Sequence, residues 1–454
     1  MRRTPLPVLV AAVLAAAALA AVLPTAAPAA DWPACTPRTA PVALGLRETA
    51  RRAEGRLLTL TLQSKALGGP QRVNVLLPPG YDPAGPTRYP VLYLLHGAQD
   101  DYAAWAAHDA AGIVGDRRLI VVMPDGGHDG SYSDWFAADD PPSPSSGQPG
   151  GAPAWESYHL GELVPFVDAH FRTRAAPGGR AIAGLSMGGH GAMKYADEAP
   201  GTFGYAGSFS GAVHPGLPLY TQFVKQCTWG DPATQGIVWH DNDPTETAGN
   251  LRGTRLFVRS GDGTAGPLDP PGFTGTDIVE TIVGQMNQAF MTTLRTAGVT
   301  SVDAAFGPGT HTWPYWQQDL RAYLAWLDAQ LRRPVTAPAT FSVESAHAAF
   351  TAWGWRLRTH RSVRELTYLR KVSAQGLTVT GSGRLGVVTP PRYRAGGRYA
   401  VRTGTARRIV RADRTGRLAF TVSLGPSHTT QQTAFDAAAT RGWKTVTVRV
   451  ARAS

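Results

Sequence analysis

The serine at position 186 stands in a pattern typical of an activated nucleophile. It is the centre of the pentapeptide Gly184-Leu185-Ser186-Met187-Gly188, whose outer glycines permit a sharp, strained turn. A short apolar run at 181–183 leads into this turn, and a small-residue helix start at 189–192 leads out of it. Strand, sharp turn and helix are the context that exposes a serine hydroxyl at the edge of a sheet. We therefore predict that Ser186 attacks a carbonyl carbon and forms an acyl-serine.

A serine hydroxyl needs a base that removes its proton and a third group that orients this base. Four histidines follow Ser186 in the first part of the chain: His190, His214, His240 and His311. His190 belongs to the helix after the turn, and His214 and His240 lie in connections rich in Pro and Asp. His311 comes between the last predicted strand of this part and its last helix, which suits the chain order serine, acid, histidine. His311 is therefore the predicted base.

Two carboxylates are candidates for the acid that orients His311. Asp262 comes just after a strand predicted at 255–258, the usual place for such an acid, whereas Glu280 opens a helix after a long loop. Position alone favours Asp262 slightly, and both stay open on the residue pattern. The alternative role for either is a solvated loop or helix-cap carboxylate.

The oxyanion formed by this attack requires two N–H donors, each contributing roughly 3 kcal/mol at the transition state. The backbone N–H of Met187, directly after the nucleophile, is the first predicted donor. The second is the N–H of Ala98, in the tight turn His96-Gly97-Ala98 after an apolar strand. His96 itself is expected to orient this loop without contacting substrate.

These residues require a scaffold of alternating strands and helices. Up to about residue 331, short apolar runs alternate with helical patterns, which is typical of a largely parallel sheet with helices on both faces. We predict strands at 57–62, 72–77, 90–95, 119–123, 181–183, 255–258 and 302–306, and helices at 160–171, 189–198, 280–296 and 315–331. Two stretches dense in Gly and Pro, 141–153 and 261–275, are predicted loops.

A smaller, basic domain is predicted after a linker at 334–340. Beyond it, short segments alternate apolar and polar residues between Gly-rich turns, which predicts an all-β, sandwich-like domain at 341–454. Residues 336–454 hold 20 Lys and Arg against 4 Asp and Glu, in a chain of net charge +11. This charge favours an anionic partner such as cell-wall polymer. The sequence contains no nucleic-acid-binding motif, so nucleic acid is not expected.

The protein is expected to be secreted, in association with the cell wall. Residues 1–30 combine Arg2 and Arg3 with an Ala/Leu/Val run that ends in small residues, the pattern of a signal peptide. The catalytic domain is then predicted at 31–333. The two cysteines, Cys35 and Cys227, are expected to form one disulfide outside the cytoplasm. No metal site is predicted, because the Cys and His spacing is too wide, and the chemistry needs no cofactor.

Several sequence blocks, taken in order, resemble one known family. They are HGAQDDYAAW (96–105), VVMPDGGHDGSYSDWF (121–136), GLSMGG (184–189), FGYAGSFSG (203–211), TWGDP (228–232) with NDP (242–244), and GTHTWPYW (309–316). Over about residues 72–331 the chain resembles the esterase D-like hydrolases, and within them the antigen 85 mycolyltransferases and their actinobacterial relatives. The resemblance implies an α/β-hydrolase fold with a mostly parallel sheet.

The resemblance also bears on individual residues. In the mycolyltransferase branch the acid is a glutamate that opens the helix before the final strand, and Glu280 matches it; Asp262 is kept as the alternative. That branch carries Asp where this chain has His96, and an oxyanion loop with an Arg near its start. The loop of this chain is about two residues shorter and has Gln99. These departures argue against trehalose mycolyl transfer. Gln99 and Trp313 are candidates for contacting the substrate.

The predicted function is that of a secreted serine carboxylesterase or acyltransferase in which Ser186, His311 and Glu280 form the triad. The expected substrate is an acyl ester, lipid and glycolipid esters included, and no obligate protein partner is expected. The alternative is a catalytically silent hydrolase-fold protein that binds the cell wall or matrix. It is the weaker hypothesis because no residue of the predicted triad is missing.

Overall fold

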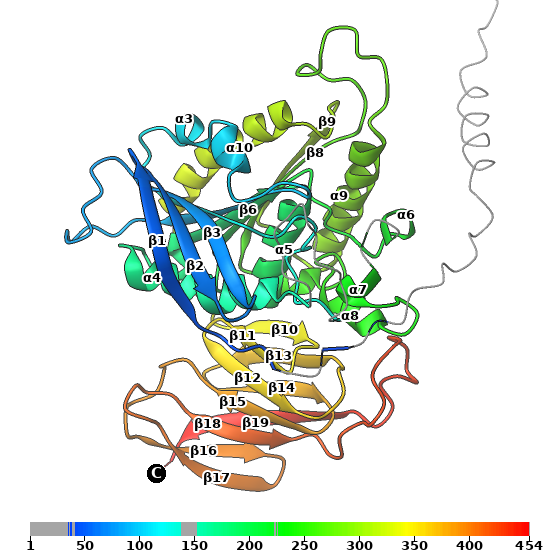
Figure 1. Cartoon of the computed structure of the whole chain (residues 1–454). Helices are drawn as coiled ribbons and strands as arrows, with labels where there is room; N and C mark the ends of the chain where they lie inside the picture. The colour runs from blue at the N-terminus through cyan, green and yellow to red at the C-terminus, as the bar shows by residue number, and fades with distance from the viewer. Residues whose placement is uncertain are drawn as a thin grey trace, which may run out of the picture. The chain divides into compact units, whose positions relative to one another are not determined.

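A nine-stranded sheet organises the first part of the chain, in the order β1-β2-β3-β5-β4-β6-β7-β8-β9 (Figure 1). Its strands are β1 (Leu46–Glu54), β2 (Leu57–Ser64), β3 (Gly69–Leu76), β4 (Val91–Leu95), β5 (Ile120–Pro124), β6 (Arg180–Leu185), β7 (Tyr205–Phe209), β8 (Arg255–Gly261) and β9 (Val302–Gly307). The strands β1 to β3 pair antiparallel and β3 pairs antiparallel with β5, whereas β5, β4, β6, β7, β8 and β9 run parallel. The prediction of a mostly parallel sheet is confirmed.

The computed structural model describes residues 35, 37–38, 41–137, 152–221, 224 and 226–453. The predicted signal peptide at 1–30 and most of the predicted loop at 141–153 lie outside these residues. Among the described helices, no segment combines the length and apolar character needed to cross a membrane.

Helices cover both faces of the sheet because its central strands carry apolar side chains on both faces. They are α2 (Ala104–Ala107), α3 (Ala110–Val114), a π-helical segment (Ser157–Leu163), α4 (Val164–His170), a 3-10 turn (Pro177–Gly179), α5 (Met187–Glu198), α6 (Pro218–Thr221), α7 (Gln226–Trp229), α8 (Gly236–Asp241), a second 3-10 turn (Ala248–Leu251), α9 (Ile278–Thr296) and α10 (Trp313–Leu331). Leu92 and Leu94 of β4 pack in the core that contains residues of α3 and α10, whereas Tyr93 and Leu95 pack in the core that contains residues of α4, α5 and α9.

Each strand and helix predicted in this part is present. Two strands, β1 and β7, were not predicted. The missed strand β7 lies in the middle of the parallel sheet. Its sequence, Tyr205-Ala206-Gly207-Ser208-Phe209, is poor in β-branched residues, and glycine is depleted in strands. Gly207 is required by packing, since a Cβ there would lie 2.7 Å from the ring of Tyr323 on α10. The strand is therefore specified by a close helix contact that its own residues do not reveal.

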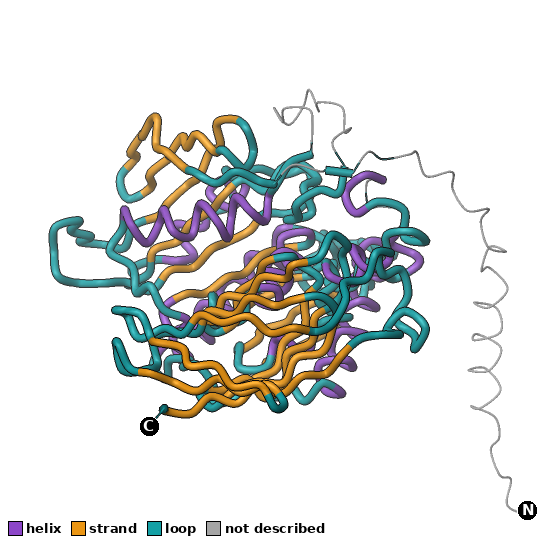
Figure 2. The backbone as a smooth tube through the Cα atoms, turned by 90° about the horizontal axis from the view of Figure 1, so that it is seen from below, coloured by secondary structure: helices purple, strands orange, loops and turns teal. Residues whose placement is uncertain are grey.

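After α10 the described chain consists of strands and loops (Figure 2). The strands are β10 (Phe341–Ser345), β11 (Ala349–Ala352), β12 (Trp355–His360), β13 (Thr367–Ser373), β14 (Gly376–Gly381), β15 (Arg384–Val388), β16 (Arg398–Thr403), β17 (Ala406–Arg411), β18 (Ala419–Ser423) and β19 (Lys444–Arg452). They form an antiparallel sheet of order β10-β13-β14-β19-β16-β17 and another of order β11-β12-β15-β18. Alternate residues, such as Trp355 and Leu357, are buried. The predicted all-β region is confirmed; the proposed domain boundaries remain a prediction.

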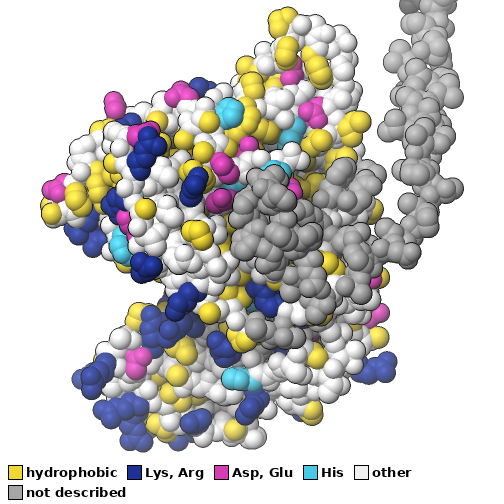
Figure 3. Space-filling model, in the orientation of Figure 1, with side chains coloured by type: hydrophobic (Ala, Val, Ile, Leu, Met, Phe, Trp, Pro, Cys, Tyr) yellow, Lys and Arg dark blue, Asp and Glu magenta, His cyan; other side chains and the backbone are white. Residues whose placement is uncertain are grey.

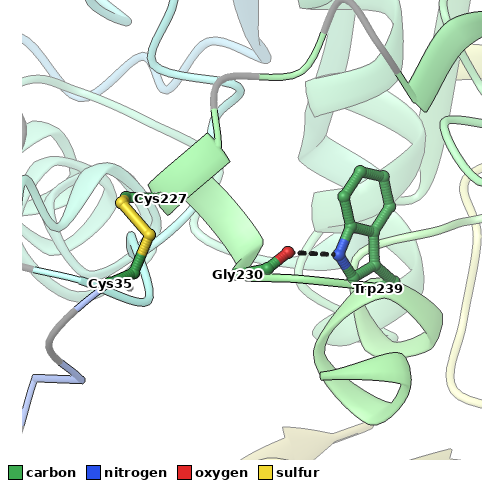
Figure 4. The surroundings of a disulfide bond; sticks show 4 residues. All are labelled: Cys35, Cys227, Gly230 and Trp239. Atoms are coloured by element: carbon green, nitrogen blue, oxygen red, sulfur yellow. Dashed lines mark hydrogen bonds between the residues drawn. A yellow bond between two sulfur atoms is a disulfide. The ribbon is translucent and has the colours of Figure 1, made fainter. Parts of the chain in front are cut away.

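The two cysteines lie together, as Figure 4 shows: the sulfurs of Cys35 and Cys227 form a disulfide across a sequence separation of 192 residues. Close to it, the indole N–H of Trp239 donates to the carbonyl oxygen of Gly230 at 2.8 Å. The bond joins the start of the described chain to helix α7.

Candidate active site

Ser186 occupies a strained turn between β6 and α5. Its backbone has φ 51° and ψ −118°, a region that non-glycine residues seldom adopt. Hydrogen bonds on both sides keep this strained backbone in place. The N–H of Ser186 donates to the carbonyl of Phe209 at 2.9 Å, and the carbonyl of Ser186 accepts from the backbone N–H groups of His190 and Ala212. The flanking glycine Gly188 is required, since a Cβ there would lie 2.5 Å from the carbonyl oxygen of His96. This is the geometry of a nucleophile elbow.

A chain of hydrogen bonds links Ser186, His311 and Glu280. The Ser186 Oγ lies 2.8 Å from His311 Nε2, and His311 Nδ1 lies 2.5 Å from Glu280 Oε2. The Glu280 side chain is fully buried, and its other oxygen accepts from the hydroxyls of Ser210 at 2.8 Å and Ser260 at 3.1 Å. A buried carboxylate that accepts hydrogen bonds at both oxygens is held in place, so it can keep His311 in one orientation.

The structure does not bring Asp262 to the histidine. Asp262 is exposed, and its Oδ1 accepts from the backbone N–H of Thr264 at 2.8 Å and from the Thr264 hydroxyl at 2.5 Å. These bonds are those of a solvated loop carboxylate, which is the alternative role given above for Asp262. The three other histidines also bond elsewhere: His190 to the carbonyl of Asn242, His214 to Asp243 and His240 to Glu246.

Asp277 is a site residue that the sequence analysis missed. Its Oδ1 accepts from the N–H of Glu280 at 3.1 Å, as the N-cap of α9, and its Oδ2 accepts from the N–H of His311 at 2.8 Å. One carboxylate therefore fixes the backbone of both partners. The pattern Asp277-Ile278-Val279-Glu280 has the spacing of a helix capping box, which could have identified the cap but not its second bond.

The predicted oxyanion donors line one small cavity. Ala98 and Met187 border a space of about 50 Å³, together with Tyr220, Trp229 and other residues. His96 holds the Ala98 loop in place: its Nε2 accepts from the N–H of Gly126 at 2.8 Å, and its Nδ1–H donates to the carbonyl of Gly97 at 2.7 Å. The orienting role expected for His96 matches these contacts.

A larger groove is lined in part by Gln99 and the residues that follow it. It has a volume of about 780 Å³, and Gln99, Asp100, Tyr102, His108 and Arg72 are among its lining residues. Burial raises the pKa of the Asp100 carboxyl. Trp313, the other candidate for substrate contact, does not line this groove; it stacks on His108 with ring centroids 3.6 Å apart. Of the two candidates, only Gln99 lines this groove.

Asp319 of α10 introduces a titrating group near the triad acid. Burial raises the pKa of its carboxyl to about 7; Arg259 lowers this pKa, and the charge of Glu280 raises it. The folded protein therefore binds one more proton at Asp319 than the unfolded chain between about pH 4 and pH 7. Since the native state holds the extra proton, stability falls as the pH rises through this window.

We expect the substitution Asp319→Asn to stabilise the protein at pH 8 and to change its stability little at pH 4. A neutral amide avoids the cost of ionising the buried carboxyl, which is roughly 4 kcal/mol for a pKa shift of this size. Thermal unfolding of both proteins from pH 4 to pH 8 measures the difference. Equal melting temperatures at pH 8 would contradict the raised pKa.

Comparisons with known proteins agree with this geometry. A family model described as "Putative esterase" matches residues 64–327, more than half of the chain. The esterase Rv1288 of Mycobacterium tuberculosis is 34% identical over 259 residues, which cover 54% of this chain and 53% of that protein. The chain thus spans about half the length of this relative.

Two further similarities concern mycobacterial proteins. The diacylglycerol acyltransferase/mycolyltransferase Ag85A of Mycobacterium gordonae is 31% identical over 279 residues, covering 57% of this chain and 78% of that protein. The solved structure of MPT51 from Mycobacterium tuberculosis is 25% identical, covers 59% of this chain and 96% of its own, and has a TM-score of 0.45. On the match to the family model and the extent of the Ag85A alignment, the chain belongs to the esterase family.

Proposed function

We propose that the protein is a secreted serine carboxylesterase or acyltransferase that works through an acyl-serine intermediate. The observation that carries this proposal is the continuous hydrogen-bond chain from Ser186 Oγ through His311 to Glu280 Oε2. A catalytically inactive hydrolase-fold protein would not require a strained serine aligned with a histidine and a buried acid. The alternative of a catalytically inactive binding protein is therefore the weaker one.

The reaction follows from the positions of these groups. As Ser186 Oγ attacks the ester carbonyl carbon, His311 Nε2 takes its proton, and the backbone N–H groups of Ala98 and Met187 stabilise the oxyanion. His311 then gives the proton to the leaving alcohol oxygen, which leaves the acyl group on Ser186. Water or an acceptor hydroxyl attacks this acyl-serine, His311 takes its proton, and the proton returns to Ser186 when the new acid or ester departs.

The spaces around the oxyanion loop favour a short acyl group and a polar second group. The cavity beside Met187 has a volume of about 50 Å³, against about 780 Å³ for the groove beside Gln99. The groove beside Gln99 is much larger and carries carboxylate, guanidinium, imidazole and phenol groups. We place the acyl group in the cavity and the alcohol, or the acceptor, in the groove.

We expect p-nitrophenyl acetate and butyrate to be hydrolysed with a kcat/KM at least about 100-fold above that of the palmitate ester, since a long chain has to displace packed side chains. Initial rates for an acyl series from C2 to C16 measure this preference. A rate that rises with chain length would overturn the short-acyl assignment and favour a lipid ester.

The β-sheet of order β11-β12-β15-β18 offers a basic face for an anionic polymer. Arg356, Arg358 and His360 point outward from β12 at alternate positions, which are about 7 Å apart. With Arg408 they line a groove of about 650 Å³ whose other lining residues include Gly386; no Asp or Glu is among its described lining residues. On the face seen in Figure 3, Lys and Arg side chains gather over the C-terminal strands. Regularly spaced cations without counter-charges suit a polymer of phosphate or carboxylate groups.

We expect the full chain to bind anionic cell-wall polymer in a salt-dependent manner, because charge attraction weakens with ionic strength. The triple variant Arg356→Gln, Arg358→Gln, Arg408→Gln should retain less than about a tenth of the binding at low salt. A matched variant with three other exposed arginines changed, Arg47→Gln, Arg52→Gln, Arg321→Gln, has the same net charge and should bind as the parent does. Equal loss in both variants would assign the binding to net charge rather than to this face.

A further inference from the structure

A second cluster of chemistry-bearing side chains lies at the far end of α5 from Ser186. It consists of Glu156, Lys194 and Glu198, which are joined by Asp241 at the end of α8 and by His347 in the turn between β10 and β11. The helix α5 rises about 1.5 Å per residue, so Glu198 lies roughly 16 Å along the helix from Met187. This cluster takes no part in the reaction described above.

Lys194 uses one oxygen of each glutamate. Its Nζ donates at 2.7 Å to Glu156 Oε2 and at 2.7 Å to Glu198 Oε2, and the Lys194 side chain is 1% exposed. The other oxygens turn toward the imidazole: His347 Nε2 lies 3.9 Å from Glu156 Oε1 and 3.6 Å from Glu198 Oε1. It also lies 3.1 Å from Asp241 Oδ2.

These facing atoms cannot all be satisfied by one another. Glu198 Oε1 and Asp241 Oδ2 face His347 Nε2 as ion pairs, but the three buried atoms form no hydrogen bond of good geometry, although the side chains of Glu198 and Asp241 are only 6% and 3% exposed. An imidazole Nε2 carries at most one proton, so it can donate to only one of three carboxylate oxygens. Buried polar groups left without partners are costly, which indicates that another group completes the cluster.

We propose that Glu156, Glu198 and His347 bind one divalent metal ion beside the Asp241 carboxylate, and that Zn²⁺ fits this site best. The ligand atoms of Glu156, Glu198 and His347 all lie within 4.8 Å of one another. A tetrahedral Zn²⁺ with bonds of about 2.0–2.1 Å holds its ligand atoms about 3.3 Å apart, and the distances from His347 Nε2 to the three oxygens bracket this value. One imidazole nitrogen and carboxylate oxygens are ligands that zinc accepts.

The charges of the cluster agree with a dication. Three carboxylates carry three negative charges, and Lys194 compensates one of them. His347 releases its Nε2 proton to solvent when it binds the ion and then adds no charge, so two negative charges remain for the ion to balance. The fourth position of the ion is left to a water molecule or to a shift of the nearby Asp241 carboxylate, and the 23% exposure of the His347 side chain provides an entry path for the ion.

The position of the proposed metal site indicates a structural role. Two hydrogen bonds hold the first C-terminal strands against the catalytic part: in the His347 turn, the N–H of Ala346 donates to Asp241 Oδ1 at 2.8 Å, and after β11 the N–H of Trp353 donates to the carbonyl of Pro200 at 2.6 Å. An ion between Glu198 and His347 would add a link between the C-terminal strands and the end of α5. We therefore expect the ion to stabilise the fold and to leave the ester hydrolysis rate of the folded enzyme nearly unchanged.

The test measures metal content and stability on the full chain. After chelator treatment and dialysis against Zn²⁺, we expect about one zinc per chain by mass spectrometry, and a rise in Tm of a few degrees at a free Zn²⁺ concentration of about 100 times Kd. The Ser186→Ala variant should bind the same amount, which separates this result from the proposed ester chemistry. His347→Gln should weaken zinc binding more than about 100-fold, since it removes a ligand.

The control is His170→Gln, which removes an exposed histidine at the end of α4 and should retain full zinc binding. Glu198→Gln serves as a second ligand variant in case His347→Gln fails to fold, as judged by circular dichroism and by ester hydrolysis. A parent protein that binds less than about 0.1 zinc per chain with no change in Tm would overturn the proposal and leave an ion-pair cluster. Unchanged zinc binding in both ligand variants would overturn it as well.

Discussion

The substitution Ser186→Ala is expected to reduce kcat for ester hydrolysis by roughly 10⁵- to 10⁶-fold and to abolish labelling by a fluorophosphonate probe. The covalent route depends on one oxygen atom, and losing the nucleophile of a triad costs about as much as losing the whole triad. Residual hydrolysis should remain above the uncatalysed rate, because the oxyanion donors Ala98 and Met187 still polarise a bound ester. Stopped assays with p-nitrophenyl acetate and in-gel fluorescence measure the two effects.

The matched control is Ser362→Ala, which changes an exposed serine in the C-terminal part and should keep full activity and labelling. The Tm of Ser186→Ala should not fall, and relief of the strained backbone at φ 51° is not expected, since alanine meets the same steric limits. Persistent labelling of Ser186→Ala would show that another residue is the nucleophile. The assignment of the whole triad would then be lost.

The sequence could predict the residues of the site because local pattern and chain order carry that information. Ser186 is marked by its glycines and by the strand and helix around it, and His311 by its place before the last helix. Local pattern and chain order did not identify the acid of the triad, because both Asp262 and Glu280 have suitable positions in the sequence. What separates them is burial: Glu280 is fully buried and Asp262 is exposed, a property of the tertiary packing around α9.

The contacts that complete the site could not be predicted for a related reason. Asp277 has a local signal as a helix cap, but its bond to the backbone of His311 joins residues 34 positions apart. The zinc ligands proposed above come from positions 156, 198 and 347, so no spacing motif marks them, and no metal site was expected. Likewise, β7 was missed because Gly207, which weakens its strand pattern, is required by the close approach of Tyr323 on a helix far along the sequence.

The substitution Glu280→Gln is expected to lower kcat by roughly 10³- to 10⁴-fold, whereas Asp262→Asn should change it less than about threefold. The Glu280 carboxylate accepts the Nδ1–H of His311 and stabilises the imidazolium that forms when Ser186 is deprotonated. A glutamine amide keeps the shape of the side chain but removes its charge, and it can present N–H to His311, which favours the wrong tautomer. Asp262 bonds only within its own loop, to Thr264.

The pair of variants separates the role of the acid from general damage to the site. Both replace a carboxylate by its amide, both lie within reach of α9 and its preceding loop, and each removes one negative charge. Fluorophosphonate labelling provides a second readout, since Ser186 in Glu280→Gln should react slowly while Asp262→Asn reacts as the parent does. If Asp262→Asn loses activity and Glu280→Gln keeps it, Glu280 is a buried structural acid, and the loop that holds Asp262 has to move toward His311 during the reaction.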